Sequence, residues 1–142
     1  MALKLKLTKL GIYAKVPSYA HAGDAGLDIY SNERVVLKPL DRYPVRTGIK
    51  IAIPKGHVGL IWDKSGLAMD GIKTIGGVID SGYRGEIKVA VINLSSKTIY
   101  LEKGQKIAQM LIQKVENAKL EVSEKLSITA RGENGFGSTG LE

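Results

Sequence analysis

GIKIAIPKGHVGLIW, residues 48–62, decides the fold class, because apolar side chains recur at every second position of its first half. A period of two is typical of a β-strand that buries one face. Pro54 ends this run, and the Lys-Gly pair at positions 55 and 56 favours a turn before the second apolar run. The stretch therefore predicts a β-hairpin, and its first strand buries alternate isoleucines, namely Ile49, Ile51 and Ile53.

Most of the chain outside this stretch also favours strands. The segments EIKVAVINL, residues 86–94, and KIAQMLIQ, residues 106–113, are predicted to form core strands, and leucines alternate with lysines in residues 3–7. Helical turns are expected at SGLAMD, residues 65–70, while residues 117–126 fit a helix or a strand and turn equally well. With 17 glycines, mostly at strand ends, the chain is predicted to be all-β, a jelly roll or distorted β-barrel.

The bulk composition is that of an ordinary folded domain. A chain of 142 residues fits one compact unit, so residues 1–142 are predicted to form a single domain. The complete lack of cysteine excludes disulfide frameworks, thiolate nucleophiles and zinc–cysteine sites. The N-terminal sequence MALKLKLTKL predicts neither a signal peptide nor a membrane span, and we expect a cytoplasmic protein without a membrane partner.

The charge balance favours anionic ligands without naming one. Twenty-one Lys and Arg against fourteen Asp and Glu give a net charge of +7, which attracts nucleotides and other polyanions. The basic residues are scattered and only 6% of residues are aromatic, so no stable nucleic-acid partner is expected. Solubility alone explains the charge equally well.

Two polar clusters in the first half of the chain favour ion or phosphate binding. In AGDAGLDIYS, residues 22–31, Asp28 stands where a strand begins and could help to hold a hydrated cation, although a simple turn role is more common. In WDKSGLA, residues 62–68, Ser65 and the backbone N–H groups that follow it suit phosphate oxygens, and Lys64 adds a positive charge. Ser65 fits the N-cap of a short helix equally well.

Two further clusters lie in the second half. GGVIDSGYRGE, residues 76–86, predicts a hairpin with the carboxylate of Asp80 at its mouth, where it could accept a proton from a water molecule. An aspartate that only forms a turn beside an exposed tyrosine fits this segment equally well. RGENGFGSTG, residues 131–140, combines an arginine, an aromatic ring and two hydroxyls with glycines, which suits a tail that closes over a nucleotide or a tail that stays disordered.

Together these clusters resemble the five motifs of the trimeric dUTPase family, in order and across nearly the whole chain. The motifs are AGDAGLDIYS, DKSGLA, GGVIDSGYRGE, GQKIAQMLI (residues 104–112) and RGENGFGSTG. The resemblance implies a dUTP diphosphatase that releases dUMP and pyrophosphate, supplies dUMP for dTMP synthesis and keeps uracil out of DNA. It also implies a β-clip jelly-roll subunit, a homotrimer, and a flexible C-terminal arm, residues 127–142, that crosses to close a neighbouring active site.

The same resemblance assigns residue roles. Asp80 would activate the attacking water, Tyr83 would select deoxyribose, and Asp28 would hold Mg²⁺ through water. The backbone between Thr74 and Asp80 would bind the uracil edge. The substrate-binding residues implied are Lys64, Ser65, Gly66, Thr74, Gly77, Val78, Ile79, Tyr83, Lys88, Gln105, Arg131, Phe136, Gly137, Ser138 and Thr139.

The motifs depart from the family pattern at two places. The second motif commonly begins with Pro-Arg, where this chain has Asp63 and Lys64, so a forked guanidinium is replaced by a point charge. Many members also carry Asn at the position of Thr74.

Three other functions fit a chain of this pattern. A dCTP deaminase, or a bifunctional dCTP deaminase and dUTPase, would share the fold and release ammonia. A non-catalytic nucleotide-sensing module would share the fold without turnover. The tyrosine of the third motif and the glycine-rich tail favour the diphosphatase.

Overall fold

The computed structural model describes residues 2–140, and within them nearly all regular structure is strand. The one helix described there is the single turn α1 (Ser65–Met69). The strands are β1 (Lys6–Lys9), β2 (Leu27–Tyr30), β3 (Val35–Leu37), β4 (Arg42–Arg46), β5 (Ile49–Ala52), β6 (His57–Asp63), β7 (Ile72–Thr74), β8 (Val78–Ile79), β9 (Lys88–Asn93), β10 (Ile99–Leu101) and β11 (Lys106–Lys114). The predicted all-β class and the helical turn after residue 65 are confirmed.

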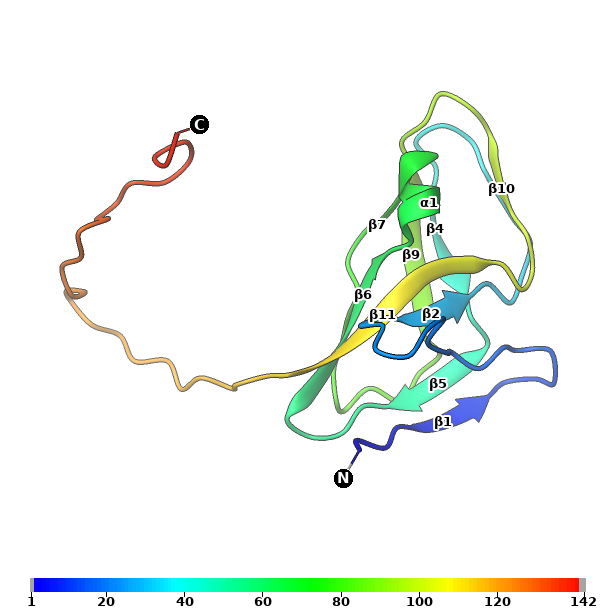
Figure 1. The fold of residues 1–142 in the computed structure, drawn as a ribbon, viewed down its shortest axis with the longest axis horizontal. Coiled ribbons are helices and arrows are strands. Elements are labelled where there is room, and N and C mark those ends of the chain that lie inside the picture. Colours follow the sequence, from blue (N-terminus) through cyan, green and yellow to red (C-terminus); the bar gives the residue numbers. More distant parts are fainter. Residues whose placement is uncertain (1, 141–142) are drawn as a thin grey trace.

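Long-range antiparallel pairing organises the strands into two larger sheets and two ribbons. The four-stranded sheet has the order β2-β11-β6-β8, and the three-stranded sheet has the order β4-β9-β7. The ribbons are β1-β5 and β3-β10. The long strand β11 crosses the body beside β2 and β6, as Figure 1 shows. It therefore joins the chain segments that carry the first and second motifs.

The core follows the period-two patterns. Val89 and Val91 of β9 are fully buried, and Ile87 directly before the strand is buried with them. In β11 the side chains of Ile107, Ala108 and Met110 are buried, with a register shift between Lys106 and Ala108. A bulge of this kind lets two successive residues face the core.

The predicted hairpin of residues 48–62 is wrong, although both of its strands exist. β5 pairs with β1, with Leu7 opposite Ile51, whereas β6 pairs with β11 and β8. Pro54 has no N–H to donate to a ladder, and the turn that follows closes through a bond from the His57 N–H to the Pro54 carbonyl. The chain therefore passes from a ribbon into a different sheet at this point.

The C-terminal segment runs away from the body of the chain (Figure 1). Every side chain of residues 113–140 is exposed, and residues 117–126 form neither a helix nor a strand. The Val115 N–H donates to the Gly56 carbonyl at 3.0 Å, close to the point where the segment departs. Among the described residues, none of the helices has the length and hydropathy that a membrane crossing requires.

Candidate active site

A hollow of about 230 Å³ surrounds the third motif, and we call it the Asp80 hollow. Its lining residues are Val78, Ile79, Asp80, Tyr83, Glu86 and Lys88. The structure thus brings together five of the residues that the sequence placed in the site. Asp80 is exposed, and it directly follows the short strand β8.

The turn after Asp80 forms as predicted, but the hairpin does not. The Tyr83 N–H donates to the Asp80 carbonyl at 3.1 Å, which closes the turn. β8 pairs with β6, and β9 pairs with β4 and β7, so the two strands that flank the turn are not paired with each other. The turn therefore projects from between two sheets, which leaves Asp80 open to a ligand.

The ring of Tyr83 is held from two sides. Its hydroxyl donates to the Glu86 carbonyl at 2.8 Å. A Cβ atom at Gly85 would lie 2.6 Å from the Tyr83 Cζ atom, which is inside van der Waals contact, so only glycine leaves room for the ring there. The side chain of Glu86 in turn accepts the Gly48 N–H at 2.9 Å and pairs with Arg46. The motif thus positions the ring of Tyr83 through Gly85 and Glu86.

A second hollow of about 260 Å³, the Asp28 hollow, joins the first and second motifs. Its lining is mostly polar and consists of Ala20, Asp24, Ala25, Gly26, Asp28, Lys64, Ser65 and Gln109. Ser65 is the first helical residue, and Lys64 occupies the N-cap position without a side-chain capping bond. The N-cap alternative for Ser65 is therefore wrong, and Gly66 follows it in the same helical turn.

Asp28 lies at the base of this hollow as a buried carboxylate between two lysines. Its side chain is 3% exposed, with Lys64 Nζ 2.6 Å from Oδ1 and Lys106 Nζ 2.9 Å from Oδ2. Burial alone would raise the pKa of Asp28, but the contacts with Lys106 and Lys64 outweigh burial and lower the pKa below its ordinary value. The carboxylate is ionised at neutral pH, and the cluster keeps one net positive charge.

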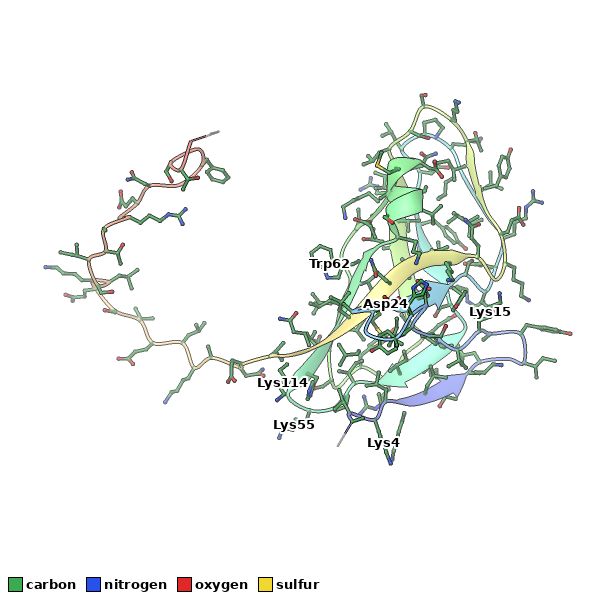
Figure 2. The ribbon with its side chains drawn as sticks, viewed as in Figure 1. Lys4, Lys15, Asp24, Lys55, Trp62 and Lys114 are labelled. Carbon is green, nitrogen blue, oxygen red and sulfur yellow. The ribbon has the colours of Figure 1, made fainter. Side chains whose placement is uncertain are left out.

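A third hollow of about 250 Å³, the Thr74 hollow, lies along β6 and the segment from β7 to β8. Its lining residues are Leu60, Ile61, Trp62, Lys73, Thr74, Gly76, Gly77 and Val78. Trp62 stands on the surface of this region with 54% of its area exposed (Figure 2). Thr74 is 7% exposed, and both its N–H and its hydroxyl donate to Asp63.

The remaining sequence candidates lie outside these three hollows. Gln105 stands in the turn before β11, where its side chain accepts the Glu102 N–H at 2.8 Å. The tail residues Arg131, Phe136, Gly137, Ser138 and Thr139 line a hollow of their own. The C-terminal segment that contains them, coloured red, lies away from the body of the chain (Figure 1). A single copy of the chain therefore does not bring the tail to Asp80.

Sequence reasoning missed three residues that contribute to these sites. Lys106 pairs with Asp28, Gln109 lines the same hollow, and the Asp63 carboxylate binds Thr74. Lys106 and Gln109 lie inside the quoted fourth motif, and the register that sets Gln109 opposite Asp28 explains their place. Only the pairing of β11 with β2 could have indicated that Lys106 and Gln109 lie beside Asp28.

The residues that the structure describes contain no cluster of three or more His, Cys, Asp or Glu side chains able to hold a metal ion by themselves. The acidic side chains of the Asp28 hollow are Asp24 and Asp28. Any divalent cation there would need most of its ligands from water or from a bound phosphate.

Comparison with known proteins decides the family, because the dUTPase family model matches residues 12–140. The chain belongs to the dUTPase family. It is 47% identical over 142 residues to the deoxyuridine 5'-triphosphate nucleotidohydrolase of Clostridium novyi, covering 98% of this chain and 100% of that protein. The corresponding protein of Mycobacterium marinum is 48% identical over 149 residues, covering 99% of this chain and 97% of that one.

Solved dUTPase structures share the fold. A mutant dUTPase of Staphylococcus bacteriophage 80alpha with dUpNHpp superposes with a TM-score of 0.91 at 30% identity, covering 99% of this chain and 100% of that one. A mutant dUTPase from phage phi11 of S. aureus, described as showing how a structural Mg(II) ion is coordinated, superposes with a TM-score of 0.83 at 26% identity, over 89% of this chain and 100% of that one. These likenesses confirm the resemblance to the dUTPase family and the predicted dUTPase-like fold.

Proposed function

We propose that this member of the dUTPase family hydrolyses dUTP to dUMP and pyrophosphate. The observation that carries the proposal is the open carboxylate of Asp80 in one hollow with the fixed ring of Tyr83. The relatives named as deoxyuridine 5'-triphosphate nucleotidohydrolases support the choice of nucleotide. In a cell, such a cytoplasmic enzyme supplies dUMP for dTMP synthesis and keeps uracil out of DNA.

Asp80 acts as the general base. Its carboxylate accepts a proton from a water molecule, and the water oxygen forms a bond to the α phosphorus while the bond from that phosphorus to the bridging oxygen breaks. The electron pair of the broken bond leaves with pyrophosphate. The protein contributes position and charge, and no covalent intermediate forms on the chain.

Tyr83 and the chain before it select the nucleoside. The ring lies under the deoxyribose, where a 2′-hydroxyl would collide with it. The backbone from Thr74 to Asp80, including Gly77, Val78 and Ile79, pairs with the uracil edge, and Lys88 lines the same hollow as Asp80. An unpaired buried polar group is costly, so a base with the wrong hydrogen-bonding edge binds weakly.

The phosphates occupy the cationic side of the site. Lys64, Ser65 and Gly66 begin the helical turn beside the Asp28 hollow, and Gln105, in the turn before β11, would bind a phosphate oxygen as well. Lys106 adds a second ammonium group close to Lys64, since both pair with Asp28. A triphosphate neutralises this excess positive charge.

The Asp28 hollow fits a hydrated magnesium ion better than a directly ligated one. Lysines already contact both carboxylate oxygens of Asp28, and Asp24 is the only other acidic side chain of the hollow. Mg²⁺ commonly keeps several waters and binds through one or two carboxylates plus substrate phosphates, so Asp28 would hold it through water. The ion would supply positive charge against the leaving pyrophosphate.

We propose a homotrimer in which each arm, residues 127–142, closes the active site of a neighbouring chain. Residues 141 and 142 of the arm lie outside the described part of the chain. Every residue of 127–140 is exposed, and the apolar side chains of Ile128 and Phe136 find no cover on their own subunit. On a neighbour, Arg131, Ser138 and Thr139 would hold the γ-phosphate, and Phe136 would stack on the base with Gly137 beside it.

Separate incubations with dUTP, dCTP, dTTP and UTP in the presence of magnesium test the activity. We expect pyrophosphate from dUTP alone, whereas ammonia from dCTP would establish the deaminase alternative. Binding of dUTP without any product would establish the non-catalytic sensor.

Asp80→Asn tests the assignment of the base. This variant should lose at least about 100-fold in kcat and still bind dUTP, because the phosphate contacts remain. Asp70→Asn, an exposed carboxylate at the end of α1, is the matched control and should retain wild-type turnover. Wild-type turnover in Asp80→Asn would refute the role of Asp80.

A further inference from the structure

One carboxylate, that of Asp63, binds three donors from β7. The Thr74 N–H donates to Oδ1 at 2.7 Å, the Thr74 hydroxyl donates to the same oxygen at 2.9 Å, and Lys73 Nζ donates to Oδ2 at 2.7 Å. The Asp63 carbonyl also accepts the Gln109 side-chain amide at 3.0 Å. The residue is therefore fixed on both its side chain and its backbone.

This arrangement fixes Thr74 completely. Lys73 Nζ lies 3.1 Å from the Thr74 carbonyl as well as 2.7 Å from Asp63, so it bridges the two residues. The N–H, the hydroxyl and the carbonyl of Thr74 are all engaged, and the residue is 7% exposed. Its side chain has no freedom to rotate without breaking a charge-assisted bond.

The pair also links two parts of the proposed site. Asp63 directly precedes Lys64 and Ser65, which border the Asp28 hollow, while Thr74 begins the segment that leads to Asp80. Asp63 and Thr74 are moreover two of the three positions at which the motifs depart from the family pattern. In this chain the departures contact each other, so they form one unit.

A hydroxyl group carries one proton, and Thr74 gives that proton to Asp63. Only lone pairs remain on the oxygen for any group in the Thr74 hollow. A ligand atom opposite it must therefore be a donor. Uracil carries a donor at ring N3, whereas the ring nitrogen of cytosine at that position is an acceptor.

We propose that Asp63 is a positioning residue for base selection, holding Thr74 with its hydroxyl oriented as an acceptor so that uracil is preferred over cytosine. The proposal rests on the proposed function, since it concerns the base of the same nucleotide. Asp63 acts through Thr74 and does not itself contact the substrate.

A double-mutant cycle tests the proposal with Asp63→Ala, Thr74→Val and the combined variant. Each single variant should lower kcat/KM for dUTP about tenfold, the effect of one lost hydrogen bond, mainly by raising KM. The preference for dUTP over dCTP, measured as a ratio of apparent affinities, should fall by a similar factor. The combined variant should be no worse than the worse single one, because both changes remove the same interaction.

Two further variants keep the test decisive. Thr74→Ser restores a hydroxyl and should recover most of the preference lost in Thr74→Val, and Asp70→Ala is an exposed control that should keep the wild-type preference. If Asp63→Ala does not fold, Asp63→Asn retains an oxygen for Thr74 but loses the charge, and it should show an intermediate loss. Additive effects, or a lower unfolding midpoint with an unchanged preference, would overturn the proposal. If the wild-type protein did not hydrolyse dUTP, the proposed function itself would be refuted.

Discussion

The ring of Tyr83 covers Gly85, two residues further along the chain, so closely that a Cβ atom there would lie 2.6 Å from Cζ and 3.0 Å from Cε2. The ring is thus held by the absence of a side chain below it and by the bond from its hydroxyl to the Glu86 carbonyl at 2.8 Å. These two features of one turn fix the group that we assign to sugar selection.

Gly85→Ala should therefore displace the Tyr83 ring without touching Asp80. We expect the preference for dUTP over UTP to fall about tenfold or more, because the ring no longer occupies the space of a 2′-hydroxyl. Rates with both nucleotides measure this, and Gly82→Ala, where a Cβ meets nothing within 4 Å, is the control. An unchanged preference would show that the ring position does not select the sugar.

The Asp63 cluster predicts how stability changes in acid. Burial raises the pKa of Asp63, but the bonds from Lys73 and Thr74 outweigh it, and the pKa lies below its ordinary value. A carboxyl group with a lowered pKa stabilises the fold above the unfolded-state value of about 3.9, and this stability is lost as the pH falls through the lower native pKa. Asp28 contributes in the same direction.

Urea midpoints of wild type and Asp63→Asn at pH 7 and at pH 3 measure the effect. At pH 7 the wild type should have a higher urea midpoint than Asp63→Asn. At pH 3 the difference between the two midpoints should be smaller. A gap of equal size at both values would mean that the charge of Asp63 does not stabilise the fold.

The strands could be predicted from the sequence, because burial of one strand face follows directly from the period of two. Val89 and Val91 alternate as expected, and so do Ile49 and Ile51. The choice of partner could not be predicted, since β5 pairs with a strand some forty residues away from it in the chain rather than with β6. Local alternation contains no information on which edge a strand will meet.

In the site, too, local features could be predicted from the sequence, whereas contacts that depend on strand pairing could not. Asp80 and its turn could be found because one short segment holds them together. Lys106 could not, because it reaches Asp28 only through the pairing of β11 with β2. The hydrogen bonds of Asp63 likewise depend on the end of β6 lying close to the end of β7, a strand of the other sheet, which no local pattern indicates.

Gly77→Ala should destabilise the fold and weaken nucleotide binding together. Gly77 has a φ of +120°, where other residues are strained, and its carbonyl accepts the Ile61 N–H at 2.8 Å. A Cβ atom would lie 2.6 Å from Ile61 Cβ, so the cost is on the order of 1–3 kcal/mol. Gly56 also has a positive φ, but a Cβ atom there would meet nothing within 4 Å. Comparing the thermal unfolding midpoints of Gly77→Ala and Gly56→Ala therefore separates the cost of backbone strain from the cost of the steric clash.

Removing every residue after Ala130 should cost most of the turnover and leave the assembly intact. The described part of the removed segment, residues 131–140, contains Arg131 and Phe136. Its hydrogen bonds run within the segment, as from Arg131 Nε to the Asn134 carbonyl, or from the Gly132 N–H to the nearby Thr129, so its loss removes no hydrogen bond from the folded body of the chain. Sizing and rate measurements on the same sample separate the two roles. An unchanged oligomer with low turnover fits an arm that closes a site, whereas dissociation into single chains would make the segment an assembly element.

Mixing the truncated protein with the Asp80→Asn variant tests whether each arm serves a neighbouring chain. If each arm serves a neighbour, mixed trimers combine an intact Asp80 from one copy with an intact arm from another, and part of the activity returns. Mixed trimers as inactive as either parent would mean that each arm closes the site of its own chain.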